Sequence, residues 1–452
     1  MENKVTIDIG KKDVYWTYLS TFLQLGSGII LFPLILRLLS SETVGVWAIF
    51  TTIFSLISLL DFGFSPSFTR NITYIFSGVD SLKKTGISEE RTHSGVNFEL
   101  LANTIKAMKW LYSRIALIAL LLLSTAGTYY LYVILKSRFT GDNQYIIIAW
   151  VLFCLISTYN IYTLYYDSLL TGRGMVKRSK QIIVISQIFY LAVSVLLLLL
   201  GFDLISIVFA QFVATLIKRI LSYNSFFTTS LKKRLSEFSA TSFREIIDII
   251  LPNSIKLGVT SLGGFLVLQA SVIIGSFYVS LENLASYGIT TQAINVIGGL
   301  GFVFYSSYVP KLSYLRVEND NRGIKNLYKK SVLILFFTFL VSGIALIYLG
   351  NPILTLLKSQ TFLLSNSMIS AILLISFLEK NHAMAGGFLL SKNEVPFYKA
   401  SLFAGLLTVG LLFLFLAKFN LSIWALIISP GIAHLYNNFK WPYELIKQVR
   451  LS

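Results

Sequence analysis

Uninterrupted apolar stretches of about 20 residues recur along nearly the whole chain, and they constrain its fold more than any other feature. A bilayer core about 30 Å thick needs roughly that many residues for each helical crossing. Continuous runs such as Leu191–Leu200, without strict alternation of apolar and polar residues, favour helices over a closed barrel. Only 13% of the 452 residues are charged, whereas soluble domains carry about a quarter. The sequence therefore predicts an all-α polytopic membrane protein.

The apolar stretches predict about twelve transmembrane helices. They lie near residues 15–38, 44–66, 110–135, 145–170, 181–201, 204–224, 248–278, 284–309, 331–350, 365–390, 396–417 and 421–439. The first fourteen residues are polar and no small-residue cleavage pattern follows them, so the first helix is expected to stay in the protein. An amphipathic stretch at 97–113 is expected to lie along the membrane before the third helix.

The 38 lysines and arginines fall mostly on one side of these predicted spans. The exceptions on the opposite side are Arg37, Lys136, Arg138, Lys358 and Lys418. Basic residues collect in cytoplasmic loops of membrane proteins, so both termini are predicted to be cytoplasmic. The same distribution accounts for most of the net charge of +17 and argues against a nucleic-acid partner, because the basic residues sit in short loops between apolar spans.

Weak internal matches divide the chain into two halves. Glu42, Trp47, Ile49 and Thr51 match Glu282, Tyr287, Ile289 and Thr291 at a constant offset, LLTGRG at 169–174 matches LLSKNE at 389–394, and GFDLIS at 201–206 matches KFNLSI at 418–423. The three matches occur in the same order in both halves. They predict two six-helix bundles related by a parallel repeat, over residues 1–225 and 246–452, joined by a basic linker at 226–245.

The beginning of the chain, TYLSTFLQLGSGIILFPLILRLLS followed by LLDFGFSPSFTR, resembles the polysaccharide exporters and O-antigen flippases of the multidrug/oligosaccharidyl-lipid/polysaccharide exporter superfamily. The likeness covers about residues 13–440. The residues that carry it are Pro33, Arg37, Glu42 to Gly45, Leu60 to Gly63, and Leu169 to Gly174. In the second half, Lys392, Asn393 and Glu394 stand where the loop has glycines, so equivalence there rests on position alone.

This resemblance implies a flippase that moves an undecaprenyl-diphosphate-linked oligosaccharide from the cytoplasmic to the outer leaflet of the bacterial inner membrane. We further expect alternating access of the two bundles, no cofactor or metal, and polysaccharide polymerase machinery as a partner. Because no ATP site is encoded, the expected driving force is an ion gradient with a proton or sodium ion as the coupling cation, the membrane potential, or consumption of the substrate on the outer face. The alternatives are a multidrug antiporter for organic cations in the same superfamily and a flippase for another lipid-linked cell-wall precursor. An acidic cavity would favour the organic cation, whereas basic residues within spans favour an anionic lipid.

Basic residues in or near the spans are the candidates for binding a diphosphate or sugar. Charge inside a membrane is costly, so it usually faces a cavity or a partner. Lys256 follows Pro252 in an apolar stretch, and snorkelling to the headgroups is the equal alternative. The other candidates are Arg37, Arg70, Arg114 and Lys380, each with an interfacial or paired role as its alternative.

Acidic residues and helix breakers supply the coupling and hinge candidates. Glu379 and His382 lie three residues apart on one helical face, beside Lys380, and are candidates for proton coupling or substrate binding. Asp61 is expected to pair with a basic residue such as Arg70 or Arg114, or to bind a coupling cation, and Asp167 is a further coupling or gating candidate with a structural alternative. His434 is expected to be a packing histidine. The predicted hinges are Gly63, Pro66 and Pro252.

No spacing typical of an enzyme is present. The sequence lacks H-E-x-x-H, G-x-S-x-G, Walker A and Cys-His metal patterns. A polymerase or ligase of the same pathway would be expected to carry a long outer loop, and the predicted outer loops are short. The single cysteine, Cys154, is expected to be buried in a helix. The sequence thus predicts a transporter and no enzymatic activity.

Overall fold

The computed structural model describes residues 10–39, 41–86, 95–138, 143–239, 241–275, 277–279, 281–356 and 362–450. Within these ranges the regular structure is helical, as the sequence predicts. The chain divides into two compact units: unit 1 comprises 1–83 and 88–251, and unit 2 comprises 84–87 and 252–452. The predicted hinge residue Pro252 stands at this division, inside a continuous helix.

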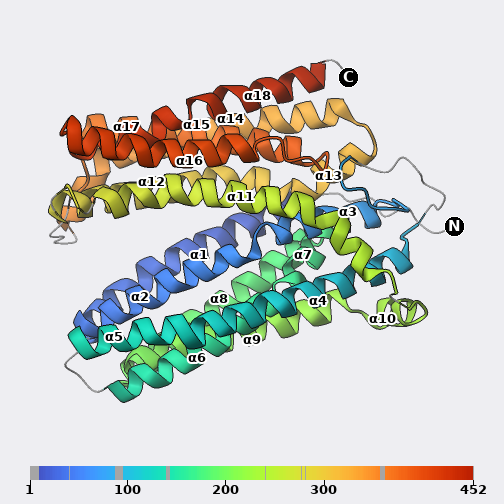
Figure 1. Ribbon diagram of the computed structural model, residues 1–452, viewed down its shortest axis with the longest axis horizontal. Coiled ribbons are helices and arrows are strands. Elements are labelled where there is room, and N and C mark those ends of the chain that lie inside the picture. Colours follow the sequence, from blue (N-terminus) through green and yellow to red (C-terminus); the bar gives the residue numbers. More distant parts are fainter. Residues whose placement is uncertain are drawn as a thin grey trace. The chain divides into compact units, whose positions relative to one another are not determined.

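Unit 1 is built from long apolar helices interrupted by short ones (Figure 1). Its elements are α1 (Lys11–Leu38), α2 (Ser41–Ser58), η1 (Leu59–Asp61), α3 (Phe64–Phe76), α4 (Phe98–Leu122), η2 (Leu123–Gly127), α5 (Thr128–Arg138), α6 (Asn143–Tyr162), α7 (Tyr165–Gly172), α8 (Val176–Leu199), α9 (Asp203–Phe226), α10 (Thr229–Ser236) and the first turns of α11. Helix α8 packs on α1 and α9, α6 packs on α4 and α9, and α3 packs on α7.

Unit 2 repeats the pattern of long helices with short interruptions. Its elements are α11 (Phe243–Gly275), α12 (Leu281–Ser307), α13 (Val309–Val317), α14 (Asn321–Leu356), α15 (Asn366–Leu390), α16 (Tyr398–Phe413), η3 (Leu414–Lys418), α17 (Ile423–Ala433) and α18 (Leu435–Arg450). Helix α12 packs on α14 and α15, and α15 packs on α18. Buried residues such as Leu335, Ile369 and Phe388 form its core.

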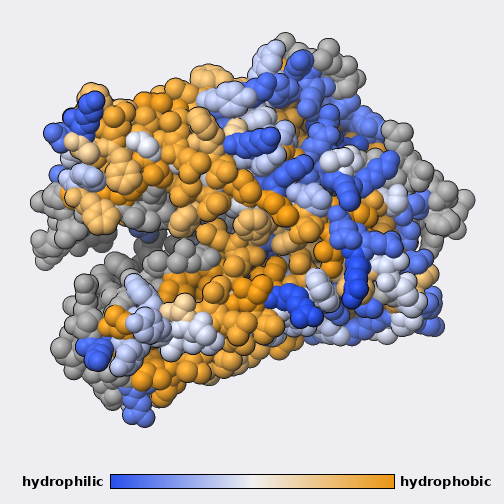
Figure 2. Space-filling view, viewed as in Figure 1, coloured by the Kyte–Doolittle hydropathy of each residue, from blue (hydrophilic) through white to orange (hydrophobic). Residues whose placement is uncertain are grey.

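Each predicted span coincides with a helix or a run of consecutive helices. Among the described residues, 8 helical stretches are long and apolar enough to cross a membrane by themselves, and many large apolar side chains are exposed. Exposed apolar surface is expected where lipid is the solvent, because a bilayer requires only that backbone polar groups be satisfied within the helices. Figure 2 shows hydrophobic residues over the middle of the helices of each unit and hydrophilic ones gathered toward helix ends. The protein is a multi-pass, all-α membrane protein.

Helix boundaries differ from the prediction at several places. The amphipathic stretch at 97–113 is no separate surface helix, because it forms the first turns of α4. The basic linker predicted at 226–245 contains α10 and lies with unit 1. Helix α9 ends at Phe226, close to the end of the predicted span 204–224, and it includes Lys218 and Arg219, whose charges the sequence counts with the cytoplasmic side.

The two units share a local contact that supports the internal repeat. In each unit a short helix follows the second span directly, α3 in unit 1 and α13 in unit 2. Thr73 of α3 donates a hydrogen bond to the Gly172 carbonyl in LLTGRG (2.9 Å), and Arg316 of α13 donates to Ser391 in LLSKNE (3.0 Å). These are the two loop sequences matched in the chain. Each short helix therefore packs on the matched loop of its own unit.

Candidate functional site

The stretch LLDFGFSPSFTR breaks the second span of unit 1. Phe62 and Gly63 adopt left-handed backbone conformations (φ 45° and 78°), which glycine tolerates at Gly63 without the steric cost of a Cβ. Pro66 lies in the first turn of α3, where its missing N–H needs no helical partner. The predicted hinge residues Gly63 and Pro66 therefore end one helix and begin the next.

Asp61 joins this break to the core of unit 1. Its carboxylate accepts a hydrogen bond from the Tyr112 hydroxyl (2.7 Å) and one from the Ser65 backbone N–H (3.2 Å). The second bond caps the start of α3, since the first N–H groups of a helix lack intrahelical partners. The sequence favours Arg70 or Arg114 as the partner of Asp61, and the structure instead gives it a tyrosine. Tyr112 is fully buried, so this bond is shielded from water.

Replacing Tyr112 with phenylalanine is expected to lower the free energy of unfolding by about 2 kcal/mol, because a hydrogen bond to a charged group is lost and the carboxylate stays partly buried. Thermal unfolding in detergent measures this loss. Tyr129→Phe is the matched control, since Tyr129 is 71% exposed on α5. Equal stability of the two variants would show that Asp61 does not depend on Tyr112.

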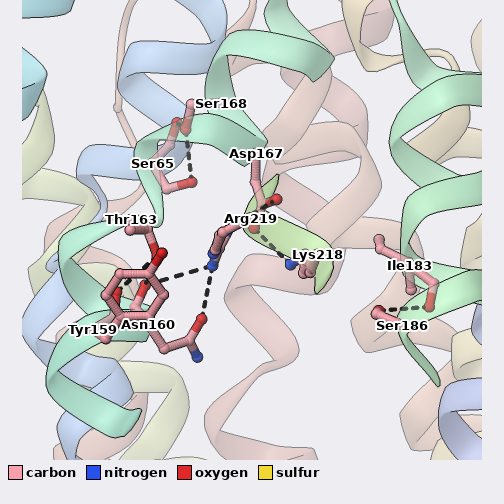
Figure 3. A network of polar contacts seen from close by, with 10 residues as sticks. All are labelled: Ser65, Tyr159, Asn160, Thr163, Asp167, Ser168, Ile183, Ser186, Lys218 and Arg219. Carbon is pink, nitrogen blue, oxygen red and sulfur yellow. Dashed lines mark hydrogen bonds and ion pairs between the residues drawn. The ribbon is translucent and has the colours of Figure 1, made fainter. Parts of the chain in front are cut away.

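A second polar cluster lies between α6, α7 and α9 (Figure 3). Asp167 on α7 forms ion pairs with Lys218 (2.8 Å) and Arg219 (3.2 Å), both on α9. Arg219 also donates to the Asn160 side-chain oxygen at 2.7 Å, and its side chain is 2% exposed. One carboxylate thus meets two cations, so the cluster keeps a surplus positive charge. Asp167 is already neutralised from within the protein, which favours its structural role over the coupling role.

Sequence reasoning missed Lys218 and Arg219 as functional candidates. Both count as cytoplasmic loop residues if α9 ends near residue 224 with its last turns solvated. The negative charge of Asp167 could have indicated them, because Asp167 lies inside a predicted span and requires a basic partner. Which basic residue pairs with Asp167 depends on the packing of α7 against α9, and no short stretch of the sequence shows that packing.

The polar residues of α15 meet the junction of α17 and α18 in unit 2. Glu379 accepts from the His434 ring nitrogen Nδ1 at 3.0 Å or forms an ion pair with it, and His382 Nδ1 lies 2.6 Å from the Asn438 side-chain oxygen. The two imidazole rings pack edge to face, with centroids 5.1 Å apart. Glu379 and His382 share one helical face, as their spacing predicts. His434 is bonded to a carboxylate, which adds a titratable group to this cluster.

Lys380 points to a different neighbour from that of Glu379. Its ammonium lies 6.0 Å from the centre of the Phe302 ring on α12, and its stem lies against Gly298, where an added Cβ would come within 2.9 Å of Lys380 Cε. Among the described residues no carboxylate is within ion-pair distance of this ammonium. Phe339, near the middle of α14, lies beside the same glycine. Lys380 is therefore a cation in the middle of the unit 2 helices with aromatic neighbours.

Lys256, inside α11, lies beside the start of α16. Its ammonium is 5.8 Å from the ring centre of Tyr398, the first residue of α16, and it is half-buried. Lys399 contacts the same ring at 5.9 Å. This position fits the snorkelling alternative, because the side chain can reach the headgroup region. Lys256 and Lys380 are thus both cations inside long apolar helices, each with an aromatic ring as a neighbour.

The three arginine candidates lie in different surroundings within unit 1. Arg70 is 5% exposed on α3, and Arg114 is exposed on α4, where its guanidinium lies 5.5 Å from the ring centre of Trp110. Arg37 belongs to α1, and its side chain lies outside the described part of the chain. The arrangement of Arg114 is that of an interfacial residue rather than of a member of the Asp167 cluster.

Two asparagines of unit 2 bind the backbone of a segment at 84–86, which comes from the connection between α3 and α4. Asn253 lies on α11, and Asn393 lies in the loop between α15 and α16. Asn253 donates to the Lys84 carbonyl (2.8 Å) and to the Asn393 carbonyl (2.8 Å), and Asn393 donates to the Gly86 carbonyl (3.3 Å). Burial, and then the nearby Arg316 guanidinium, lower the pKa of Lys392 in the same loop. Asn393, one of the three residues that stand in place of the loop glycines, therefore holds the backbone of this segment.

Comparison with solved structures identifies the fold. A multidrug resistance MATE family transporter of the MOP superfamily in an outward-facing conformation superposes with a TM-score of 0.72 at 12% identity, over 97% of this chain and 95% of that one. MATE in complex with MaD3S gives 0.68 at 14% identity, over 98% and 95%. No protein-family profile and no curated protein sequence matches the chain.

A third similar structure bears on the meaning of charge in this fold. It is a MOP superfamily transporter from Pyrococcus furiosus, described as having a binding pocket of reverse polarity that suggests a different function, with a TM-score of 0.67 at 15% identity over 97% of this chain and 95% of that chain. At such identities the likeness shows the fold. The protein has the fold of MATE family transporters of the MOP superfamily.

Proposed function

We propose that the protein is a transporter that moves a bulky anionic amphiphile, a polyprenyl-diphosphate-linked oligosaccharide, from the cytoplasmic to the outer leaflet by alternating access. The observation that carries the proposal is Lys380, a lysine in the middle of the unit 2 helices with no carboxylate partner among the described residues. A lone charge at such depth is costly, so it is retained where a ligand of opposite charge compensates it.

The balance of charge in unit 1 supports the same class of substrate. The two cations around Asp167 exceed its single negative charge, and Lys180 on α8 lies near enough to interact electrostatically with the same carboxylate. Glu379 and Asp61 each have hydrogen-bond donors from the protein. The Asp167 cluster of unit 1 and Lys380 of unit 2 are therefore positively charged sites, which would attract a diphosphate and repel an organic cation.

A multidrug exporter for organic cations is the second candidate. The solved structures that resemble this chain include multidrug resistance transporters of the MATE family, which favours this candidate directly. Its acidic groups would be Glu379 and Asp61. The reversed pocket polarity described for the Pyrococcus furiosus protein illustrates that this fold serves more than one polarity. The charge of the substrate-binding residues therefore distinguishes the flippase from the multidrug exporter.

Coupling by a proton is assigned to the cluster of Glu379, His434 and His382. A carboxylate and two imidazoles in contact can exchange a proton without leaving an isolated charge in the membrane. The proposal places the protein in the bacterial cytoplasmic membrane with both termini on the cytoplasmic side, near the polymerase machinery that would consume the exported oligosaccharide.

Transport in proteoliposomes tests the proposed function. Flipping of a fluorescent polyprenyl-diphosphate oligosaccharide is expected to slow about tenfold or more in Lys380→Ala, because a cation–phosphate contact in a low-dielectric site is lost. Lys380→Arg keeps the charge and is expected to retain most of the activity. Lys256→Ala is expected to have a smaller effect, because Lys256 lies beside Tyr398 at the start of α16, where its ammonium can reach the headgroup region.

Lys399→Ala is the matched control for this test. It removes an exposed lysine that contacts the same tyrosine ring as Lys256, and flipping is expected to be unchanged. Efflux of an organic-cation dye is measured in parallel. Dye efflux without lipid flipping would replace the proposal with the multidrug candidate, while flipping that ignores Lys380→Ala would remove the lysine from the binding site.

A further inference from the structure

A shallow surface cavity of about 490 Å³, wide open to its surroundings, lies between the first turns of α8 and the last turn of α9 in unit 1. Proteins hold small ligands in pockets of roughly 300–1,000 Å³. Its lining residues are mostly polar or basic, and none of them is acidic: Met175, Lys177, Arg178, Gln181, Asn224 and Ser225. The cavity is separate from the Asp167 cluster, whose residues are not among those that line it.

The two basic side chains give this cavity its charge. Arg178 donates from Nε to the Ser225 hydroxyl at 2.9 Å, which joins the two walls and leaves its terminal nitrogens available to an anion. The backbone N–H of Lys177 already donates to Asp13 Oδ1 at 2.8 Å, so this N–H is not available to an anion. The attraction for an anion therefore comes from the side chains of Lys177 and Arg178. Guanidinium and ammonium groups both bind phosphate strongly.

Apolar surface continues from the cavity along both helices. Ile220 lies one turn before Asn224 on α9 and is 57% exposed. Ile188 and Phe189 lie two turns after Gln181 on α8, and they are 52% and 46% exposed. Residues spaced four or seven apart share one helical face. A polar pocket that leads into an exposed apolar strip matches a ligand with a charged headgroup and a hydrocarbon chain.

The position of the cavity fits the surface of the membrane. It lies at the end of α9 that leads within three residues to α10, a helix with Lys232, Lys233 and Arg234. The distribution of basic residues predicts that this end faces the cytoplasm. Basic pockets between transmembrane helices on that side bind anionic headgroups. We propose that this cavity binds the headgroup of an anionic phospholipid of the cytoplasmic leaflet, with its acyl chains along Ile188, Phe189 and Ile220.

This binding does not rest on the identity of the transported substrate, and lipid titration of the full chain tests it. The protein in neutral detergent is titrated with phosphatidylglycerol labelled on an acyl chain, and binding is followed by fluorescence anisotropy. The double variant Lys177→Gln/Arg178→Gln is expected to bind about 30-fold more weakly, which is roughly 1 kcal/mol for each basic residue. Binding of labelled phosphatidylcholine is expected to change less than twofold.

A second variant and a control separate the cavity from general charge. Asn224→Trp fills the cavity and keeps its charge, and it is also expected to weaken phosphatidylglycerol binding at least tenfold. Lys325→Gln/Lys329→Gln removes the same charge from two exposed lysines of α14 and is expected to leave binding unchanged. Equal weakening by the control pair, or wild-type binding by both cavity variants, overturns the proposal.

Two competitors identify the source of the phosphate. Unlabelled phosphatidylglycerol is expected to displace the labelled lipid, whereas inorganic phosphate at the same concentration is not, because it makes no use of the apolar strip. Polyprenyl diphosphate is expected to compete weakly. If polyprenyl diphosphate binds far more tightly than phosphatidylglycerol and loses that binding in Lys177→Gln/Arg178→Gln, the cavity is a substrate site and the phospholipid assignment is wrong.

Discussion

Arg219→Leu is expected to lower the free energy of unfolding by about 3 kcal/mol, because it breaks a buried ion-pair network from one side. Arg219 is 2% exposed, and its guanidinium links Asp167 to Asn160. Without it, Lys218 still neutralises Asp167, but the Asn160 side chain loses its charged donor and a cavity is left between α6 and α9. Thermal unfolding in detergent measures the loss as a melting temperature lower by roughly 5–10 °C.

Two further variants test whether the loss of stability in Arg219→Leu comes from the buried ion-pair network. Arg114→Leu removes an exposed arginine of the same unit and is expected to change stability by less than about 0.5 kcal/mol. Combining Asp167→Asn with Arg219→Leu is expected to cost less than the sum of the two single changes, since both act on one network. Strict additivity would show that the two residues do not stabilise each other.

Gly263→Ala is expected to cost about 3 kcal/mol, the upper end of what overpacking usually costs. An added Cβ at Gly263 would overlap the Ser401 carbonyl oxygen and lie 2.9 Å from the Leu402 nitrogen. A Cβ at Gly405 would in turn lie 2.8 Å from the Gly263 oxygen. The backbones of α11 and α16 therefore touch, and backbone cannot move aside as a side chain can. Small residues permit such close packing of membrane helices.

The next residue along α11 provides the control for Gly263. A Cβ at Gly264 would meet nothing within 4 Å. Gly264→Ala is expected to keep or slightly raise stability, because alanine favours helix over glycine by about 1 kcal/mol. The two variants are compared by thermal unfolding and by yield of folded protein in detergent. Equal stability would mean that α11 and α16 are not in backbone contact at Gly263.

The helices could be predicted from the sequence, because an apolar run long enough to cross a membrane is visible in a single stretch of residues. Their ends were less readable. Lys218 and Arg219 fall inside the predicted span 204–224, but their charges indicate the cytoplasmic side and give no hint that Asp167 and Asn160 bind them. The break at Phe62 and Gly63 lies inside a single apolar run, and only the glycine and the aspartate indicate it.

The candidate site could be predicted only where its residues belong to the same helix. The spacing of Glu379 and His382 fixes a common face, and the structure confirms it. Their partners are His434, between α17 and α18, and Asn438 of α18, so these contacts depend on how distant segments pack. Asp61 shows the same limit: its charge predicts a partner, but the choice of Tyr112 over an arginine is made by the packing of α4. Residues far apart in the chain meet in the fold without any local signal.

The repeated contact between a short helix and a matched loop bears on ancestry. Thr73 with Gly172 and Arg316 with Ser391 join the same two places in the two units, although the residues that make the bonds differ. A duplicated gene leaves such a trace when shape is retained while side chains change. The connection after α13 is only Glu318–Asp320, whereas the one after α3 runs over 77–97 and supplies the segment bound by Asn253 and Asn393. The repeated contact thus tolerates connections of very different length after the short helix.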